Sequence, residues 1–392
     1  MQRYKTLISA FFIMLCLGGV YAWSSFAFEL QNHYKFTTFQ SQLIFGMMIA
    51  VFPVTMLFVR RLKKISSKKL IQFSALLFAF SYIVSGLSKG NFYIIFFSLG
   101  ILLGIATGIG YLLALTIPMK WFPHTTGLVS GVIAAGFGLA SVILPYIIKV
   151  CLDMNLSVLN IFVLIGLVYG CIIFVCASYF YEPKQEAKNT EIKISEFILN
   201  KDFQRLFIGI FLGTFAGLLI IGNLKTIGAE RIDNLYVLIT GISIFSFSNF
   251  LGRITWGYFC DYKNNDIVTS TALVLQSISI FFLLKLQGNI YLYLILSGMI
   301  GFCFGANFVI FAKQTSQLFG INQIAYIYPC VFLGYALAGI LGPTTGAVLN
   351  DLFKNFNLSI ILAALMSLTG AMIFILKVKK DFSSRVFSSE RT

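Results

Sequence analysis

The most conspicuous absence from this sequence is charge within its long apolar stretches. None of the 14 Asp and Glu residues falls inside one of them, and of the 29 Lys and Arg residues only Arg253 clearly does. The mean hydropathy is +0.88, and each apolar stretch of about 20 residues can cross ~30 Å of hydrocarbon as a helix. The sequence therefore predicts a protein that spans a membrane many times.

Further absences narrow the class of protein. The apolar runs show no period-two alternation, which excludes a membrane β-barrel. No phosphate-binding lysine loop is present, the two histidines (His33 and His124) lie in predicted loops, and the seven cysteines lack metal-ligand spacing. We therefore expect no enzymatic activity, no cofactor and no metal site.

Twelve apolar segments can be counted, which predicts an all-α membrane protein. We expect spans at 7–28, 39–59, 70–87, 91–117, 127–147, 156–180, 203–222, 236–259, 267–286, 291–312, 323–348 and 358–376.

The distribution of positive charge predicts the orientation. If both termini are cytoplasmic, 21 Lys and Arg residues fall on the cytoplasmic side and seven on the outer side, with Arg253 between them. This bias favours an even number of spans across the cell membrane, with both termini on its cytoplasmic side. The net charge of +15 is then a topology signal and an attraction to anionic lipid. It gives no reason to expect a nucleic-acid partner.

A polar segment divides the chain in its middle. Residues 181–202 form the longest polar stretch and separate six spans from six spans. This predicts an N-terminal six-helix bundle (1–180), a cytoplasmic linker (181–202), a C-terminal six-helix bundle (203–376) and a cytoplasmic tail (377–392). Two such bundles are typical of transporters that bind their substrate between the halves, near the bilayer midplane.

Five motifs carry a specific resemblance. They are GGVYAWSSF (18–26), GIGY (108–111), KWFPHTTGLVSGVIAAGFGLASVI (120–143), NFLGRITWGYFCD (249–261) and GFCFGANFVIFAKQTSQLFG (301–320). In this order they resemble the oxalate:formate antiporter family of the major facilitator superfamily. The resemblance extends over most of the chain and implies a twelve-helix major facilitator fold, two six-helix bundles and transport of organic anions.

Arg253 is the principal candidate for binding an anion. A cation within a span is costly and usually faces protein or water, and the resemblance implies that an arginine in this span binds a substrate carboxylate. Asn249 and Trp256 share its helical face, and a guanidinium can hold a carboxylate through two hydrogen bonds. Arg253 could instead be structural, reaching the cytoplasmic interface or pairing with Asp261.

Aromatic and small residues complete the predicted site. Tyr21 and Tyr111 lie in family-like motifs and carry hydroxyls that need partners, and Phe304 and Phe308 form a stripe on the tenth span. The resemblance implies a second cation in the eleventh span, but alignment through ILGP places Tyr335 there. Packing or gating roles are expected for Gly131, Gly136, Gly257 and Asp261.

A binding site that holds one cation and lacks the second favours a substrate with a single negative charge. We expect a secondary transporter that moves a small monocarboxylate such as formate, lactate or pyruvate by alternating access, as an exchanger or a facilitator, and as a monomer. Two alternatives stay open. One is a carrier of a neutral or heterocyclic metabolite in which Arg253 is structural. The other is a receptor that keeps a transporter fold without moving substrate.

Overall fold

The computed structural model describes residues 1–59, 62, 65–183 and 197–389. Within these ranges the chain is helical throughout, and its elements follow one another in the order below. They are α1 (Gln2–Leu17), a 3₁₀ segment (Gly18–Ala22), α2 (Trp23–Tyr34), α3 (Thr38–Val59), α4 (Ser67–Gly86), α5 (Phe92–Ile95), a π-helical segment (Phe96–Leu102), α6 (Leu103–Trp121), α7 (Thr126–Asp153), α8 (Val158–Ser178), α10 (Lys201–Ala229), α11 (Leu235–Tyr262), α12 (Asn265–Phe282), a 3₁₀ segment (Leu283–Lys285), α13 (Ile290–Phe319), α14 (Ile324–Phe353) and α15 (Asn357–Ser389).

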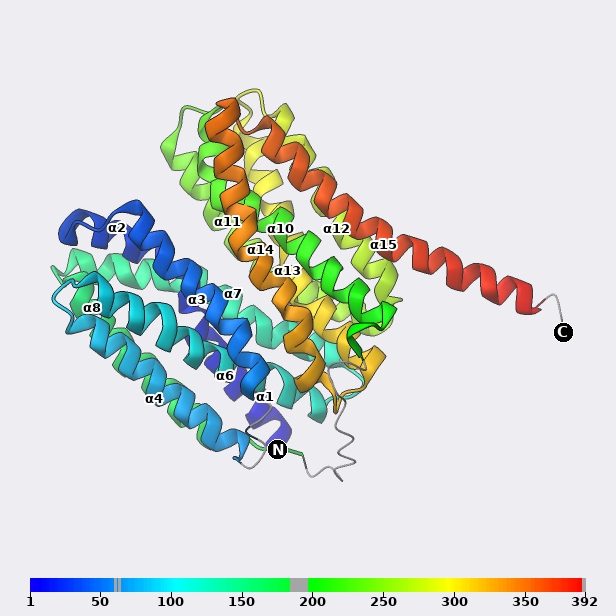
Figure 1. The fold of residues 1–392 in the computed structure, drawn as a ribbon, viewed down its shortest axis with the longest axis horizontal. Coiled ribbons are helices and arrows are strands. Elements are labelled where there is room, and N and C mark those ends of the chain that lie inside the picture. The colour runs from blue at the N-terminus through cyan, green and yellow to red at the C-terminus, as the bar shows by residue number, and fades with distance from the viewer. Residues whose placement is uncertain (60–61, 63–64, 184–196, 390–392) are drawn as a thin grey trace.

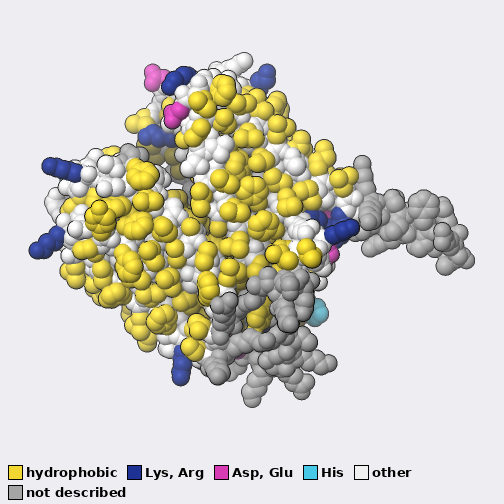
Figure 2. Space-filling view, viewed as in Figure 1, with side chains coloured by type: hydrophobic (Ala, Val, Ile, Leu, Met, Phe, Trp, Pro, Cys, Tyr) yellow, Lys and Arg dark blue, Asp and Glu magenta, His cyan; other side chains and the backbone are white. Residues whose placement is uncertain are grey.

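Twelve helices of the described chain are long and apolar enough to cross a membrane. This number confirms the prediction from the apolar segments. Large apolar side chains such as Phe39 and Tyr93 are more than 70% exposed, and hydrophobic side chains cover most of the visible face in Figure 2, with Lys and Arg at its periphery. A surface of this kind is stable against lipid.

The helices pack as two halves. Helices α1 to α8, the N-terminal half, contact mainly one another, and helices α10 to α15, the C-terminal half, do the same (Figure 1). The pairs α7–α11, α3–α14 and α7–α13 make the main contacts between the halves. The boundaries predicted for the bundles stay predictions, and residues 184–196 of the predicted linker lie outside the described residues.

Polar side chains cap the helices where the chain turns. Asn200, Asn264 and Asn289 each accept a hydrogen bond from a backbone N–H in the first turn of the helix that follows. Such caps satisfy donors that would otherwise have no partner. Lys354 follows α14 in a left-handed conformation with φ 56°, which ends that helix.

Three features differ from the prediction. The first span, expected as one helix over 7–28, is interrupted by a 3₁₀ turn at Gly18–Ala22. The fourth contains a π-helical turn at Phe96–Leu102, and such turns often mark functional positions. The last helix runs on to Ser389 and projects beyond the other helices (Figure 1), where a tail from residue 377 was expected.

The hydrogen bonds that join the two halves are unevenly placed. We call the end of the molecule at which α1 begins the Met1 end; α7 also begins there and α11 ends there. Among the described residues, such bonds occur near the middle of the spans, at Tyr21–Tyr335 and Arg253–Ala134, and at the Met1 end, around Asp261. The structure is therefore closed at the Met1 end.

Candidate functional site

Arg253 on α11 is completely buried and lies where the two halves meet. Its Nε donates to Asn249 Oδ1 at 3.0 Å, and its Nη1 donates to the carbonyl oxygen of Ala134 on α7 at 2.7 Å. Its guanidinium carbon lies 4.3 Å from the centre of the Phe308 ring, a cation–π contact. Nη2 is buried without a hydrogen-bond partner. The Nη2 end of the guanidinium is thus the part of Arg253 that has no protein acceptor.

The close approach of α7 and α11 depends on glycine. A Cβ atom at Gly131 would lie 2.4 Å from the Arg253 carbonyl oxygen, and one at Gly138 would lie 3.3 Å from the Arg253 Nε. At the Met1 end, Gly127 and Gly257 face each other, and a Cβ on either would lie 2.5 Å from the carbonyl oxygen of the other. These contacts confirm that small residues of the fifth span allow close helix packing.

Gly136 has a different neighbour. A Cβ there would lie 2.6 Å from the carbonyl oxygen of Phe11 on α1. Gly136 therefore packs within the N-terminal half, away from the interface that Gly131 and Gly257 form. This contact fits the packing role expected for Gly136, and a gating role for it stays a prediction.

Aromatic rings from both halves pack around Arg253. Tyr21 lies in the 3₁₀ turn, and its hydroxyl is 2.6 Å from that of Tyr335 on α14. The Phe308 ring lies 5.3 Å from the Tyr335 ring, which links Arg253 to this tyrosine pair. Tyr111 on α6 is buried and its hydroxyl has no hydrogen-bond partner. Tyr328 on α14 is also buried, and its ring lies 5.3 Å from that of Phe332. Four tyrosine hydroxyls and one guanidinium thus lie in one aromatic cluster.

The rest of the cluster was not predicted from the sequence. The Tyr111 ring lies 4.9 Å from Phe52, 5.3 Å from Phe137 and 5.5 Å from Phe332. Phe52 and Phe137 belong to the N-terminal half and Phe332 to the C-terminal half, so the rings close over the interface. A chain with 42 Phe residues gives no local signal that distinguishes these three from packing residues.

Two predicted residues have other neighbours. Trp256 packs in a separate cluster with Cys260, Cys303 and residues of α12, and its indole N–H has no hydrogen-bond partner. Phe304 contacts Phe308 at 5.2 Å but lies deeper, against Phe245 of α11. The shared helical face that placed Trp256 beside Arg253 does not bring its ring to the aromatic cluster.

Asp261 holds the halves together at the Met1 end. Its side chain is 2% exposed. One carboxylate oxygen accepts from the Gly127 N–H at 2.9 Å and the other from the Leu128 N–H at 2.7 Å, in the first turn of α7. A carboxylate is favoured at a helix N-terminus by the unpaired N–H groups and the helix dipole.

Lys313 on α13 completes this contact. Its ammonium donates to Asp261 and to the hydroxyl of Thr126, each at 2.8 Å. The span predicted over 291–312 ends before Lys313, which places this residue in a loop, but α13 continues to Phe319. The pair Asp261–Lys313, with its bonds to α7, is called the Met1-end latch below.

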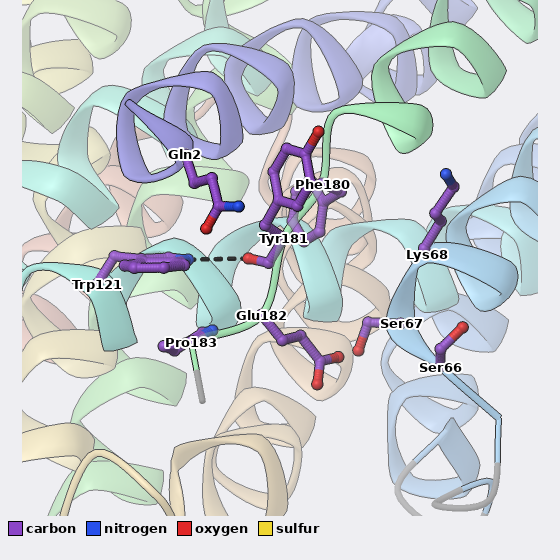
Figure 3. A pocket seen from close by; sticks show the side chains of 9 residues that line it. All are labelled: Gln2, Ser66, Ser67, Lys68, Trp121, Phe180, Tyr181, Glu182 and Pro183. Atoms are coloured by element: carbon purple, nitrogen blue, oxygen red, sulfur yellow. Dashed lines mark hydrogen bonds between the residues drawn. The ribbon is translucent and has the colours of Figure 1, made fainter. Parts of the chain in front are cut away.

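A cavity of about 630 Å³ lies elsewhere, at the ends of α1, α4 and α6 (Figure 3). Its walls include Lys68, Ser67, Glu182 and Trp121, and the Trp121 indole donates to the Tyr181 carbonyl oxygen at 2.8 Å. None of the residues that line this cavity belongs to the aromatic cluster around Arg253, so the two places are separate. The residues predicted from the motifs lie at the cluster.

Comparison with known proteins relates the chain to membrane transporters. The family model of the Major Facilitator Superfamily matches residues 6–233. YhjX of Escherichia coli, an uncharacterized MFS-type transporter, is 26% identical over 352 residues, which cover 86% of each chain. The oxalate:formate antiporter of Oxalobacter formigenes is 27% identical over 288 residues, covering 69% of this chain and 66% of the antiporter.

A solved structure shows the same fold. The transporter FucP, crystallised in the outward conformation, superposes with a TM-score of 0.71 at 14% sequence identity, covering 95% of this chain and 99% of FucP. At this identity the likeness concerns the fold alone.

Proposed function

The chain belongs to the major facilitator superfamily and is a multi-pass membrane transporter, and on that premise we propose that it carries a small monocarboxylate between its two halves by alternating access. The observation that carries this proposal is the buried Nη2 of Arg253, a cationic donor without a partner, set among aromatic rings from both halves. A carboxylate is the acceptor that best satisfies a guanidinium.

The charge at the site favours a monoanion. Tyr335 stands where the resemblance places a second cation, and its hydroxyl is paired with Tyr21. A dianion would bring one carboxylate into a low-dielectric site without a counter-charge, which is costly. Formate, lactate and pyruvate each need only Arg253. The similarity to an oxalate:formate antiporter supports this choice of substrate class.

The predicted orientation indicates which side of the membrane the closed Met1 end faces. The excess of Lys and Arg on the loops at the Met1 end favours a cytoplasmic position for that end, in the cell membrane. The closed Met1-end latch would then block the path from the site to the cytoplasm. Transport requires the latch to open while the opposite end closes, since a rocking carrier exposes its site to one side at a time.

One observation favours a second candidate function. Two nitrogens of Arg253 already bond to protein oxygens, as those of a structural arginine would. The aromatic rings alone would then recognise a neutral or heterocyclic metabolite.

Thermal unfolding of the purified protein separates the two candidates. A bound monocarboxylate at 100 times its Kd should stabilise the native state by about 2.7 kcal/mol, which raises Tm by several degrees. The Arg253→Gln variant should fold and lose this response, and Arg253→Lys should lose most of it, because a point charge does not reproduce the planar fork. An equal response from the Arg253→Gln variant, or a response to neutral heterocycles only, would favour the second candidate.

A further inference from the structure

The cavity at the Met1 end is lined by one cation and one anion. Its walls carry Lys68 at the start of α4 and Glu182 after the end of α8. Within the described chain neither side chain forms an ion pair, and Lys120, which lies within electrostatic range of Glu182, forms none with it either. Two unpaired charges of opposite sign in one cavity suit a ligand that carries both signs.

The two charges have different surroundings. Lys68 and the hydroxyls of Ser66 and Ser67 come from the start of α4, Trp121 lies on the opposite wall, and Glu182 lies between them (Figure 3). The Ser66 oxygen accepts a backbone N–H, so its own hydroxyl hydrogen can be donated to a ligand. An ammonium and hydroxyls bind phosphate oxygens, whereas a carboxylate and an indole ring bind an ammonium group.

The cavity lies where lipid headgroups meet the protein. It is formed at the ends of α1, α4 and α6, each of which belongs to a membrane-competent helix. Trp121 and Tyr181 line it, and these residue types are enriched at membrane–water interfaces. On α4 the side chains of Phe73, Leu76 and Phe80 are more than half exposed. Acyl chains can therefore pack along the helix that supplies Lys68 to the cavity.

We propose that this cavity binds the headgroup of a phospholipid that carries a primary amine, as ethanolamine lipids do. The phosphate bonds to Lys68 and the two serine hydroxyls, and the ammonium bonds to Glu182 beside the Trp121 ring. A choline headgroup has no N–H to donate to Glu182. A glycerol headgroup brings a negative charge toward Glu182 without an ammonium to balance it. The bound headgroup joins the start of α4 to the end of α6 and to the segment after α8.

Lipid preference is measured by native mass spectrometry of the delipidated full-length protein. It is titrated with phosphatidylethanolamine, phosphatidylcholine and phosphatidylglycerol that have identical acyl chains. The ethanolamine lipid should bind at least about tenfold more tightly than either of the others, because only it forms the charge-assisted bonds to Glu182. Equal affinities, or tightest binding of the glycerol lipid, would overturn the proposal.

Reversal of one charge should reverse the preference. Glu182→Lys should bind the glycerol lipid about tenfold more tightly than the ethanolamine lipid, a gain that misfolding cannot produce. The control is Asp153→Lys, the same reversal at an exposed position at the far end of α7, which should keep the original preference. A Glu182→Lys variant that still prefers the ethanolamine lipid would contradict the proposal.

A neighbouring pair of lysines tests the phosphate contact. Lys68→Gln should weaken the binding of all three lipids, because each carries a phosphate. Lys69 is the next residue and does not line the cavity, so Lys69→Gln should leave the affinities unchanged. Equal weakening in both variants would show that lipid responds to the general positive charge of this end, and would overturn the assignment to the cavity.

Deuterium exchange distinguishes a lipid from a soluble ligand with the same head group. The Tyr181 amide donates to Thr6 Oγ1 at 3.2 Å beside the cavity. In nanodiscs of ethanolamine lipid this amide should exchange roughly tenfold more slowly than in nanodiscs of choline lipid. Free phosphoethanolamine, added to the choline nanodiscs in an equal molar amount, should not protect it. Equal protection by the free compound would overturn the assignment to a lipid, and no protection by either would overturn the site itself.

Discussion

The buried guanidinium of Arg253 has no carboxylate partner in the described chain. The residues around it suit a buried cation. Gly131 and Gly138 give it room on α7, Asn249 fixes its Nε, and Phe308 presents the electron-rich face of a ring. What remains unsatisfied is Nη2. A single free donor group next to hydroxyls is suited to a small anion.

Tyr335 is expected to set the number of charges on the substrate. In the Tyr335→Lys variant a second ammonium lies in the cluster, so a dianion gains a counter-charge, and its affinity relative to formate should rise at least about tenfold. Competition between oxalate and formate for binding measures the change. The Tyr335→Phe variant loses the bond to Tyr21 without a gain of charge and should show no shift toward oxalate. Tighter binding of oxalate than of formate by the unmodified protein would show that another cation reaches the site.

The sequence predicts this site only where a residue is chemically unusual. Arg253 is the single clear charge within an apolar run, and Tyr21, Tyr111 and Tyr335 are located by motifs or alignment. The sequence does not indicate that the Ala134 carbonyl binds Arg253, because every residue has a backbone carbonyl. Trp256 was misplaced because a shared helical face covers a wide arc, and its ring points to α12 and α13 instead.

Among the helices, α7 and α11 form the most extensive contact between the two halves. They touch along glycines and are joined by Arg253 near their middle and by Asp261 at the Met1 end. The sequence predicts both helices and the close approach of α7 from its small residues. It does not predict that α13 extends far enough to bring Lys313 to Asp261, because a charged residue ends an apolar run whether or not the helix continues.

The Met1-end latch should show non-additive energetics. Asp261→Asn leaves the Lys313 ammonium buried without its counter-ion, and the loss of one partner of a buried pair costs about 3–5 kcal/mol. The double variant Asp261→Asn with Lys313→Gln removes both charges and should be less destabilised at the closed end than Asp261→Asn alone. Deuterium exchange at the Gly127 and Leu128 amides measures this in a double-mutant cycle. Additive effects would show that the two side chains act independently.

For the molecule as a whole, twelve membrane-competent helices in the described chain are arranged so that the cluster lies between two halves that are joined at one end. The number of spans could be read from the sequence, since lipid requires long apolar helices. The interruptions in the first and fourth spans could not. The 3₁₀ turn that carries Tyr21 begins with Gly18 and Gly19, but glycine also occurs inside unbroken helices of this chain, such as Gly131 and Gly138 of α7.

Arg253 is proposed to bind the carboxylate of a transported monoanion. The most direct test is uptake of labelled formate and pyruvate into proteoliposomes that contain the unmodified protein, Arg253→Gln or Arg205→Gln. Arg205 is the matched control, because it is also a buried arginine of the C-terminal half but is paired with Asp202 and Asp266. We expect uptake by the unmodified protein and by Arg205→Gln, and none above background by Arg253→Gln. Equal uptake by Arg253→Gln and the unmodified protein would contradict the account.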